Sequence, residues 1–325
     1  MKKWLYAGVA LLLVQIALVV ILNVNHRQDL AAFTPHENLL HFSPSAVDTI
    51  TVLGAKNSKV TLQKVDGTWL LPELFKAPAD EKKVEGLLHK LADLKEGLAV
   101  ATTKGAAKRF KVGKDNFERH VILKKGNETV ADFFLGTSPE FRMVHARVHD
   151  RPEVVSVKLS TYELEARPDL WLDHHLAAVD QEKIGTLSMG DISLTRKDGT
   201  WSLAGLAPTE ELNTAQVNDL LEKISTLNVD GVLDPTTDQD LFKKSPALTI
   251  AMTLKDHSTR TYTFAKPAKE GDYLLKSSAH NELFKVGDYV VDGLQKFSRK
   301  SLIKAKKEAT ASKTSNGKAP SMAKK

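Results

Sequence analysis

The stretch VDGTW at residues 65–69 recurs almost unchanged as KDGTW at residues 197–201. The chain contains only four Trp, so a chance recurrence of Asp-Gly-Thr-Trp is improbable. Asp66-Gly67 and Asp198-Gly199 are strong β-hairpin signals, because a type I′ turn requires positive φ at both central residues. The two stretches therefore predict two hairpins of the same design.

Each predicted hairpin has one apolar face that carries its Trp. The alternation of strand residues places Val60, Leu62, Trp69 and Leu71 on this face of the first hairpin, and Ile192, Leu194, Trp201 and Leu203 on that of the second. Such a sheet packs one face on a core and exposes the other to water. We expect Trp69 and Trp201 to be buried at equivalent positions. The residues expected to have structural roles are Asp66, Gly67, Trp69, Asp198, Gly199 and Trp201.

A helical pattern follows each hairpin. VEGLLHKLADL at residues 84–94 and VNDLLEKISTL at residues 217–227 place apolar residues at the same positions of one helical stripe. Asp80 is expected to cap the first helix, and Asn213 with Gln216 resembles a capping box for the second. The correspondence between the two halves therefore extends beyond the hairpins.

Further matching patterns follow the two helices. HVILKKGNETVADFFLG and LTIAMTLKDHSTRTYTFA each predict two strands joined by a turn, and two more strands and a helix follow each of them. We predict an α+β fold with two duplicated units, each a β-hairpin, a helix, an antiparallel β-meander and a terminal helix. The predicted boundaries are 43–158 for the first unit, 159–176 for a connector and 177–297 for the second unit.

The N-terminal residues 1–25 predict a membrane anchor. Residues 4–22 form an apolar run that only Gln15 interrupts. As a helix it would span roughly 28 Å, close to the thickness of the bilayer hydrocarbon. A cleaved signal peptide is the alternative, but the run is long for one and no small-x-small cleavage site follows it. Residues 26–42 are expected to form a short stalk.

Charge predicts the orientation of this anchor. Lys2 and Lys3 precede the apolar run and should remain in the cytoplasm. The expected location is therefore the inner (cytoplasmic) membrane, crossed once, with a cytoplasmic N-terminus and a periplasmic body. The bilayer is then one predicted partner, bound through residues 4–22.

The basic charge of the chain is concentrated at its C-terminus. The formal net charge is +6, and residues 298–325 hold nine Lys or Arg and one acidic residue. A segment with so few apolar residues is expected to be disordered. It could contact anionic lipid or another acidic polymer of the envelope, or act only as a solubilising tail. Nucleic-acid binding is disfavoured, because the charge is not interleaved with a folded aromatic surface.

The residue types needed for metal and covalent chemistry are sparse. The chain has no Cys, which excludes disulfides, thiolate metal sites and a Cys nucleophile. His174-His175 are adjacent and point in different directions. His145 and His149 lie in a predicted strand, where their spacing separates them by roughly 13 Å. Neither pair is expected to bind a metal.

Two other stretches resemble known sites only in part. DPTTDQD at residues 234–240 lacks the ligands and the Gly of a calcium loop, and helix capping by Asp238 is the favoured interpretation. TLSMG at residues 186–190 has Thr186 where a nucleophile elbow requires Gly. We therefore predict no catalytic residues, no cofactor, no metal and no small-molecule ligand.

These patterns together resemble a bacterial family, domain of unknown function 4340. The resemblance rests on the apolar N-terminal run, the twin DGTW turns, the leucine-rich helices and the linking stretch LWLDHHLAAVDQEKIGTLSM. Phe110-Lys-Val-Gly and Leu241-Phe-Lys-Lys-Ser-Pro also precede the two meanders, and the whole resemblance covers residues 4–297. It implies a single-pass envelope protein of the kind often encoded beside a gliding-motility-type ABC transporter, without established catalytic residues.

The resemblance leads to an expected function. We expect a membrane-anchored, extracytoplasmic, non-enzymatic accessory or interaction subunit of an ABC-type envelope transport complex. Its expected partners are ABC-2-type membrane subunits. The alternative is an independent envelope-binding module for peptidoglycan or polysaccharide.

Overall fold

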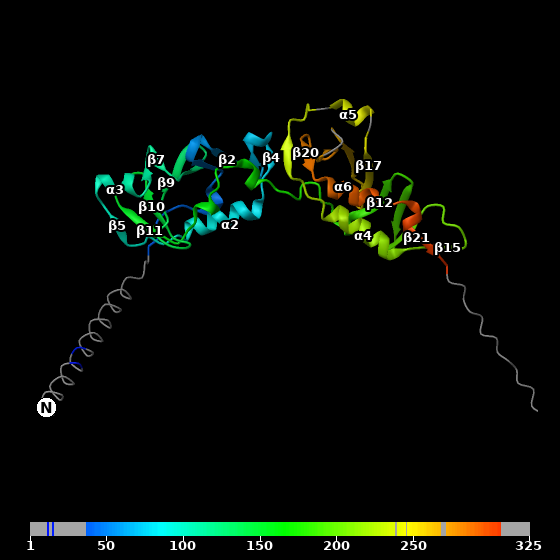
Figure 1. Cartoon of the computed structure of the whole chain (residues 1–325), viewed down its shortest axis with the longest axis horizontal. Coiled ribbons are helices and arrows are strands. Elements are labelled where there is room, and N and C mark those ends of the chain that lie inside the picture. The colour runs from blue at the N-terminus through cyan, green and yellow to red at the C-terminus, as the bar shows by residue number, and fades with distance from the viewer. Residues whose placement is uncertain are drawn as a thin grey trace, which may run out of the picture. The chain divides into compact units, whose positions relative to one another are not determined.

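The chain divides into two compact units, Met1–Asp173 and His174–Lys325. Both are mixed α+β structures rich in strands (Figure 1). The computed structural model describes residues 12, 15, 37–237, 239–244, 246–267 and 271–306.

The first unit is built on an antiparallel sheet with the strand order β4-β3-β2-β1-β8-β9-β10-β11-β5. The strands are β1 (Thr49–Gly54), β2 (Lys59–Val65), β3 (Thr68–Leu71), β4 (Ala77–Pro78), β5 (Ala99–Ala101), β8 (Arg119–Lys125), β9 (Glu128–Leu135), β10 (Val144–Val148) and β11 (Val154–Val157). A separate small ribbon pairs β6 (Val112–Gly113) with β7 (Asn116–Phe117). The helices are α2 (Glu81–Ala92) and α3 (Lys104–Arg109), and short 3-10 turns are η1 (Pro44–Ala46), η2 (Ala55–Asn57), η3 (Pro72–Leu74), η4 (Thr161–Glu163) and η5 (Pro168–Trp171).

The two faces of this sheet are covered by different elements. Helix α2 begins after Asp80, whose side chain accepts a hydrogen bond from the Lys83 amide, as the sequence predicts. The helix buries its apolar stripe beside the β2–β3 hairpin. The adjacent residues Phe133 and Phe134 of β9 point to opposite faces, and both are fully buried. Phe134 packs with Ala106 of α3 and with the β6–β7 ribbon, so the sheet has a core on each side.

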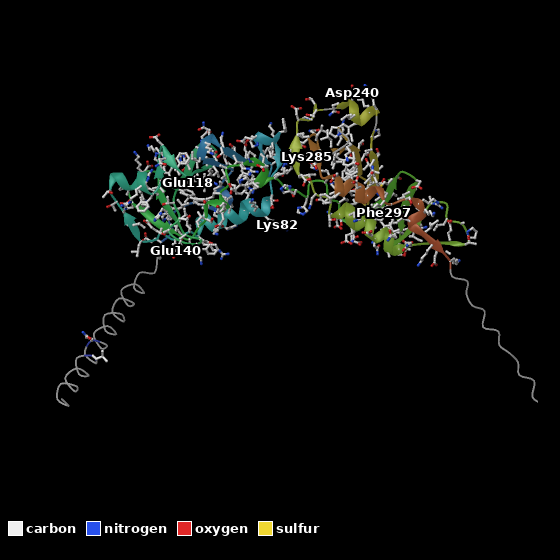
Figure 2. The ribbon with its side chains drawn as sticks, viewed as in Figure 1. Lys82, Glu118, Glu140, Asp240, Lys285 and Phe297 are labelled. Carbon is white, nitrogen blue, oxygen red and sulfur yellow. The ribbon has the colours of Figure 1, made fainter. Side chains whose placement is uncertain are left out.

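The second unit has a sheet with the strand order β14-β13-β12-β17-β18-β19-β20-β16. The strands are β12 (Ile184–Met189), β13 (Ile192–Lys197), β14 (Thr200–Leu203), β16 (Gly231–Leu233), β17 (Leu248–Leu254), β18 (Thr259–Ala265), β19 (Tyr273–Ser277) and β20 (Leu283–Val286). A two-stranded ribbon pairs β15 (Glu210–Leu212) with β21 (Ile303–Ala305). The helices are α4 (Thr214–Ser225), α5 (Gln239–Lys244) and α6 (Asp288–Gln295), with the 3-10 turns η6 (Gln181–Lys183) and η7 (Arg299–Leu302). Phe297, labelled in Figure 2, follows α6 and is buried.

Both predicted hairpin turns are confirmed. Asp66 and Gly67 have φ of 49° and 86°, and Asp198 and Gly199 have φ of 52° and 80°. These values match the type I′ requirement for positive φ at both positions. In the register that these turns set, Lys64 lies opposite Trp69 in the first hairpin and Arg196 lies opposite Trp201 in the second.

The predicted terminal helix of the first unit is wrong. The stretch LSTYELEA, residues 159–166, contains only the 3-10 turn η4, which Ser160 begins with a capping box. Leu159, Leu164 and Ala166 are all buried on the unit. Pro168 follows closely and disfavours helical geometry for the residue before it. The second unit does have its predicted terminal helix, α6.

The structure also moves two predicted boundaries. Leu302 is fully buried and β21 pairs with β15, so residues 298–306 belong to the second unit rather than to a disordered tail. At the other end, Leu39 and Leu40 of the predicted stalk are buried, and Asn38 bridges to Lys95. Residues 307–325 lie outside the described residues.

The predicted anchor is not covered by this description. Apart from Leu12 and Gln15, residues 4–22 lie outside the described residues, as do residues 26–36 of the predicted stalk. Within the part of the chain that is described, we find no helix whose length and apolar content would let it cross a membrane.

Candidate functional site

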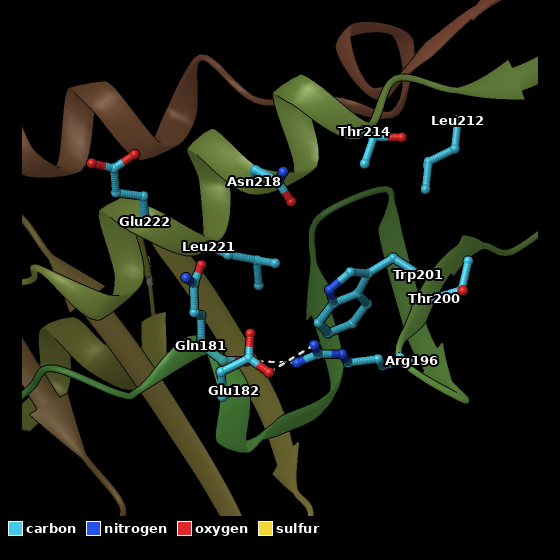
Figure 3. Close-up of a pocket in the computed structure, with 11 residues that line it drawn as sticks. Gln181, Glu182, Arg196, Thr200, Trp201, Leu212, Thr214, Asn218, Leu221 and Glu222 are labelled. Atoms are coloured by element: carbon cyan, nitrogen blue, oxygen red, sulfur yellow. Dashed lines mark hydrogen bonds and ion pairs between the residues drawn. The ribbon is translucent and has the colours of Figure 1, made fainter.

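A cavity in the described part of the second unit lies beside Trp201 (Figure 3). Its volume is 660 Å³. The turn η6, the β13–β14 hairpin, strand β15 and helix α4 supply its walls. The lining residues are Gln181, Glu182, Arg196, Gly199, Thr200, Trp201, Leu212, Thr214, Asn218, Leu221 and Glu222. We call this cavity the Trp201 pocket.

The hairpin register places a cation beside the Trp ring. Arg196 and Trp201 are directly paired across the two strands, and the Arg196 guanidinium carbon lies 5.8 Å from the ring centroid. Arg196 Nη2 donates to Glu182 Oε2 at 2.8 Å, and Nη1 donates to the Gln181 carbonyl oxygen at 3.3 Å. The Arg196 Nε is buried and donates to none of the described atoms. An unsatisfied buried donor costs about 1–3 kcal/mol, so the second hairpin holds its cation at some cost in stability.

The rest of the pocket offers further polar groups around a partly exposed ring. Trp201 is half-buried, so the expectation that it is buried like Trp69 is wrong. Asn218, Leu221 and Glu222 of α4 line the pocket on the side across from the Trp201 ring (Figure 3). The pocket can therefore combine aromatic contact with hydrogen bonds and with charges of both signs.

A smaller cavity lies at the corresponding place in the first unit. It has a volume of 360 Å³ and lies between η1, the β2–β3 hairpin and α2. Lys64 Nζ lies 5.6 Å from the Trp69 ring centroid and 3.7 Å from Glu85 Oε1. Trp69 is only 1% exposed, in contrast to Trp201. Both hairpins thus hold a cation against their Trp, but the second leaves its ring accessible.

A second group of polar side chains lies in the first unit, away from the hairpin. His120 of β8 and His149, which follows β10, both contact Asp132 of β9. The distances are 2.8 Å from His120 Nε2 to Asp132 Oδ1 and 2.8 Å from His149 Nδ1 to Asp132 Oδ2. The three potential ligand atoms lie within 4.8 Å of one another, close enough to surround one metal ion.

This group is not predicted by spacing along the chain, because its three residues are far apart in the sequence and lie on different strands or strand ends. His149 belongs to this group, although the sequence predicts no metal site for it, whereas His145 Nδ1 lies 2.8 Å from the Thr137 carbonyl oxygen. The available signal was Asp132, an acidic residue in the apolar strand sequence VADFF, next to a strand that carries His120.

The other stretches considered in the sequence have local structural roles. His174 Nδ1 lies 2.6 Å from the Val229 carbonyl oxygen. Asp234 Oδ1 accepts hydrogen bonds from the side chain and the amide of Thr236, which lowers the pKa of Asp234. The predicted cap Asp238 lies outside the described residues.

A family model described as a domain of unknown function (DUF4340) matches residues 69–247, more than half of the chain. The chain belongs to this family. The match includes both hairpin Trp, the whole Trp201 pocket and the group of His120, Asp132 and His149. No curated protein and no solved structure matches the chain. The DUF4340 match therefore assigns the family and leaves the function to be argued from the site.

Proposed function

We propose that this DUF4340 protein is a membrane-anchored, extracytoplasmic, non-enzymatic interaction subunit of an ABC-type envelope transport complex. The Trp201 pocket is its contact site for a partner, and ABC-2-type membrane subunits are the proposed partners. The single observation that carries the binding role is the half-buried Trp201 ring, which lies beside the Arg196 guanidinium in the wall of the pocket. The proposed anchor and location rest on the apolar run at residues 4–22 and on the two Lys before it.

The chemistry of the pocket suits a segment of another protein. Trp and Arg are the residues most enriched among those that dominate protein interfaces. The volume of 660 Å³ falls within the usual range for binding cavities. Glu182 and Glu222 can face basic groups, while the exposed amide of Asn218 can donate to a backbone carbonyl. A partner segment would thus supply an apolar side chain for the ring and backbone acceptors for the rim.

We also infer that the two units are copies of one ancestral unit. Every strand of the second sheet has a counterpart in the first sheet, and the counterparts follow one another in the same order. In the first sheet this order is β3-β2-β1-β8-β9-β10-β11-β5. The helices α2 and α4 occupy corresponding places after the hairpins and share the pattern of buried residues. Under this inference the Trp201 pocket is an enlarged form of the cavity beside Trp69.

Substitution on one wall of the pocket tests the contact. Asn218 and Ala215 are both exposed on α4, but only Asn218 lines the pocket. In the full chain at native expression, Asn218→Arg is expected to reduce recovery of ABC-2-type membrane subunits in a mild-detergent pull-down after crosslinking. Ala215→Arg is the matched control and should leave recovery unchanged. Equal recovery with both variants would show that the pocket is not part of the interface.

The alternative function is an independent module that binds peptidoglycan or polysaccharide. It is favoured by the same half-buried ring next to the amides of Gln181 and Asn218, because an amphipathic aromatic face and amides can contact sugar rings and hydroxyls. Co-sedimentation of the full chain with purified peptidoglycan, lost in Asn218→Arg and kept in Ala215→Arg, would support this function instead.

A further inference from the structure

The group His120, Asp132 and His149 is assembled by three neighbouring strands. His120 lies opposite Phe134, and Phe134 lies opposite Arg147 on the next strand. Since cross-strand partners share a face and residues two apart on a strand share it too, Asp132 and His149 lie on the same face as His120. The His149 amide donates to the Asp132 carbonyl oxygen at 2.9 Å, which fixes His149 at the end of β10.

The donor atoms suit a divalent transition ion. Two imidazole nitrogens and one carboxylate are ligands that Zn²⁺ accepts at about 2.0–2.2 Å. In a tetrahedral site such ligand atoms would be separated by roughly 3.3 Å. His120 Nε2 and His149 Nδ1 each lie 2.8 Å from an Asp132 oxygen, and the group spans no more than 4.8 Å. Small side-chain rotations therefore suffice to place all three around one ion.

Packing around the group orients the His120 ring and holds the backbone of His149. The His120 ring stacks on Phe134, with 4.2 Å between ring centroids, and Phe117 contacts its edge at 5.6 Å. The buried Arg147 donates to the carbonyl oxygens of Val112 and His149, each at 2.7 Å. Arg147 thus binds the backbone of His149 rather than the Asp132 carboxylate. Groups that orient metal ligands in this way are what a preformed site requires.

The group is accessible from solvent. The side chains of His120, Asp132 and His149 are 15%, 24% and 27% exposed. An ion can therefore enter without unfolding of the sheet. Three protein ligands also leave at least one coordination position for water or for another ligand, the arrangement found in open zinc sites.

The second unit provides an internal comparison. Its sheet registers place Thr249, Thr261 and Ser278 where the first unit has His120, Asp132 and His149. The Ser278 amide donates to the Thr261 carbonyl oxygen at 3.0 Å, as His149 does to Asp132. The sheet therefore forms this backbone contact without imidazole or carboxylate groups. The fold therefore does not require His and Asp side chains at these three positions of the first unit.

We propose that His120, Asp132 and His149 form a binding site for one Zn²⁺, held by His120 Nε2, His149 Nδ1 and the Asp132 carboxylate. This site is separate from the Trp201 pocket and does not depend on the function proposed for that pocket.

Metal titration of the untagged full chain in detergent tests the site. After chelator treatment, calorimetry with Zn²⁺ is expected to give one bound ion per chain. His149→Asn and Asp132→Asn should each weaken binding at least about 100-fold, the upper end of what loss of an outer-shell partner costs. His89→Gln is the matched control, since His89 is exposed on α2, and it should bind as the native chain does.

A second measurement uses the native chain and therefore tests the site even if the variants fail to fold. X-ray absorption at the zinc edge on the native chain should show two imidazole ligands together with oxygen ligands. Absence of stoichiometric binding to the native chain, or a spectrum with oxygen ligands alone, would overturn the proposal. Equal binding by folded His149→Asn would also overturn it, because the ion would then lie elsewhere.

Discussion

Trp69 and Trp201 hold the same position in their hairpins but differ in exposure. Trp69 is 1% exposed, whereas Trp201 is half-buried in the wall of its pocket. Large-to-small substitution costs most where the side chain is fully packed. Trp69→Ala should therefore destabilise the first unit by about 3–5 kcal/mol. Trp201→Ala should cost the second unit only about 1–2 kcal/mol, since less of the ring is withdrawn from water.

Hydrogen exchange resolved by peptide can measure the two losses separately, because each unit reports its own opening free energy. The amides of β2 and β13 are the relevant probes. Equal losses of protection in the two variants would contradict the difference in burial.

Tyr262 allows a prediction about pH. Its ring is fully buried, and burial raises the pKa of the phenol above its ordinary value. The unfolded chain releases this proton near pH 10, while the folded second unit retains it. The folded state then binds more protons, so stability falls as the pH rises above about 10. Tyr262→Phe should remove this contribution to the loss of stability at alkaline pH.

At neutral pH, Tyr262→Phe should leave stability unchanged or raise it by up to about 1 kcal/mol. The reason is that the buried Tyr262 hydroxyl makes no hydrogen bond of good geometry among the described residues, and the nearby Arg260 only partly offsets the effect of burial on its pKa. Chemical denaturation of the native chain and of Tyr262→Phe measures both effects. It is carried out at pH 7 and at about pH 10.5, which lies about 0.5 above the ordinary phenol pKa. A clear loss of stability at pH 7 would show that the hydroxyl is satisfied after all.

At the scale of elements, residues 298–306 decide where the second unit ends. Strand β21 pairs with β15, Leu302 is fully buried, and Lys304 Nζ lies 3.3 Å from Glu211 Oε1. Deletion of residues 307–325 should leave the thermal midpoint of the second unit unchanged. Deletion of residues 298–325 should lower it by several degrees, because it also uncovers apolar surface. Equal midpoints for the two truncated chains would contradict this boundary.

Elements with strong local signals could be predicted from the sequence. The Asp-Gly turns require positive φ, and the apolar stripes of α2 and α4 can be recognised from the spacing of their apolar residues. The segment Ile303–Ala305 could not be recognised, because a three-residue strand with a Lys resembles the basic tail until its partner β15 is known. The group around Asp132 depends on the register of three strands, which spacing along the chain does not reveal.

At the scale of the whole molecule, the two units have sheets with matching strand orders and differ in the sites they carry. The first unit holds the His120, Asp132 and His149 group, and the second holds the larger pocket. A duplicated unit can keep its core while each copy changes its surface, because core packing and surface chemistry lie on different side chains. This division agrees with an interaction subunit whose two halves have separate tasks.

Crosslinking from within the Trp201 pocket tests the proposed function most directly. Thr214 lines the pocket and is exposed, whereas Thr195 is exposed on the polar face of the hairpin and does not line it. A photoreactive amino acid at position 214 of the full chain, activated in intact cells, should form adducts with an ABC-2-type membrane subunit. The same amino acid at position 195 should not. Adducts from both positions alike, or none from position 214, would contradict the account.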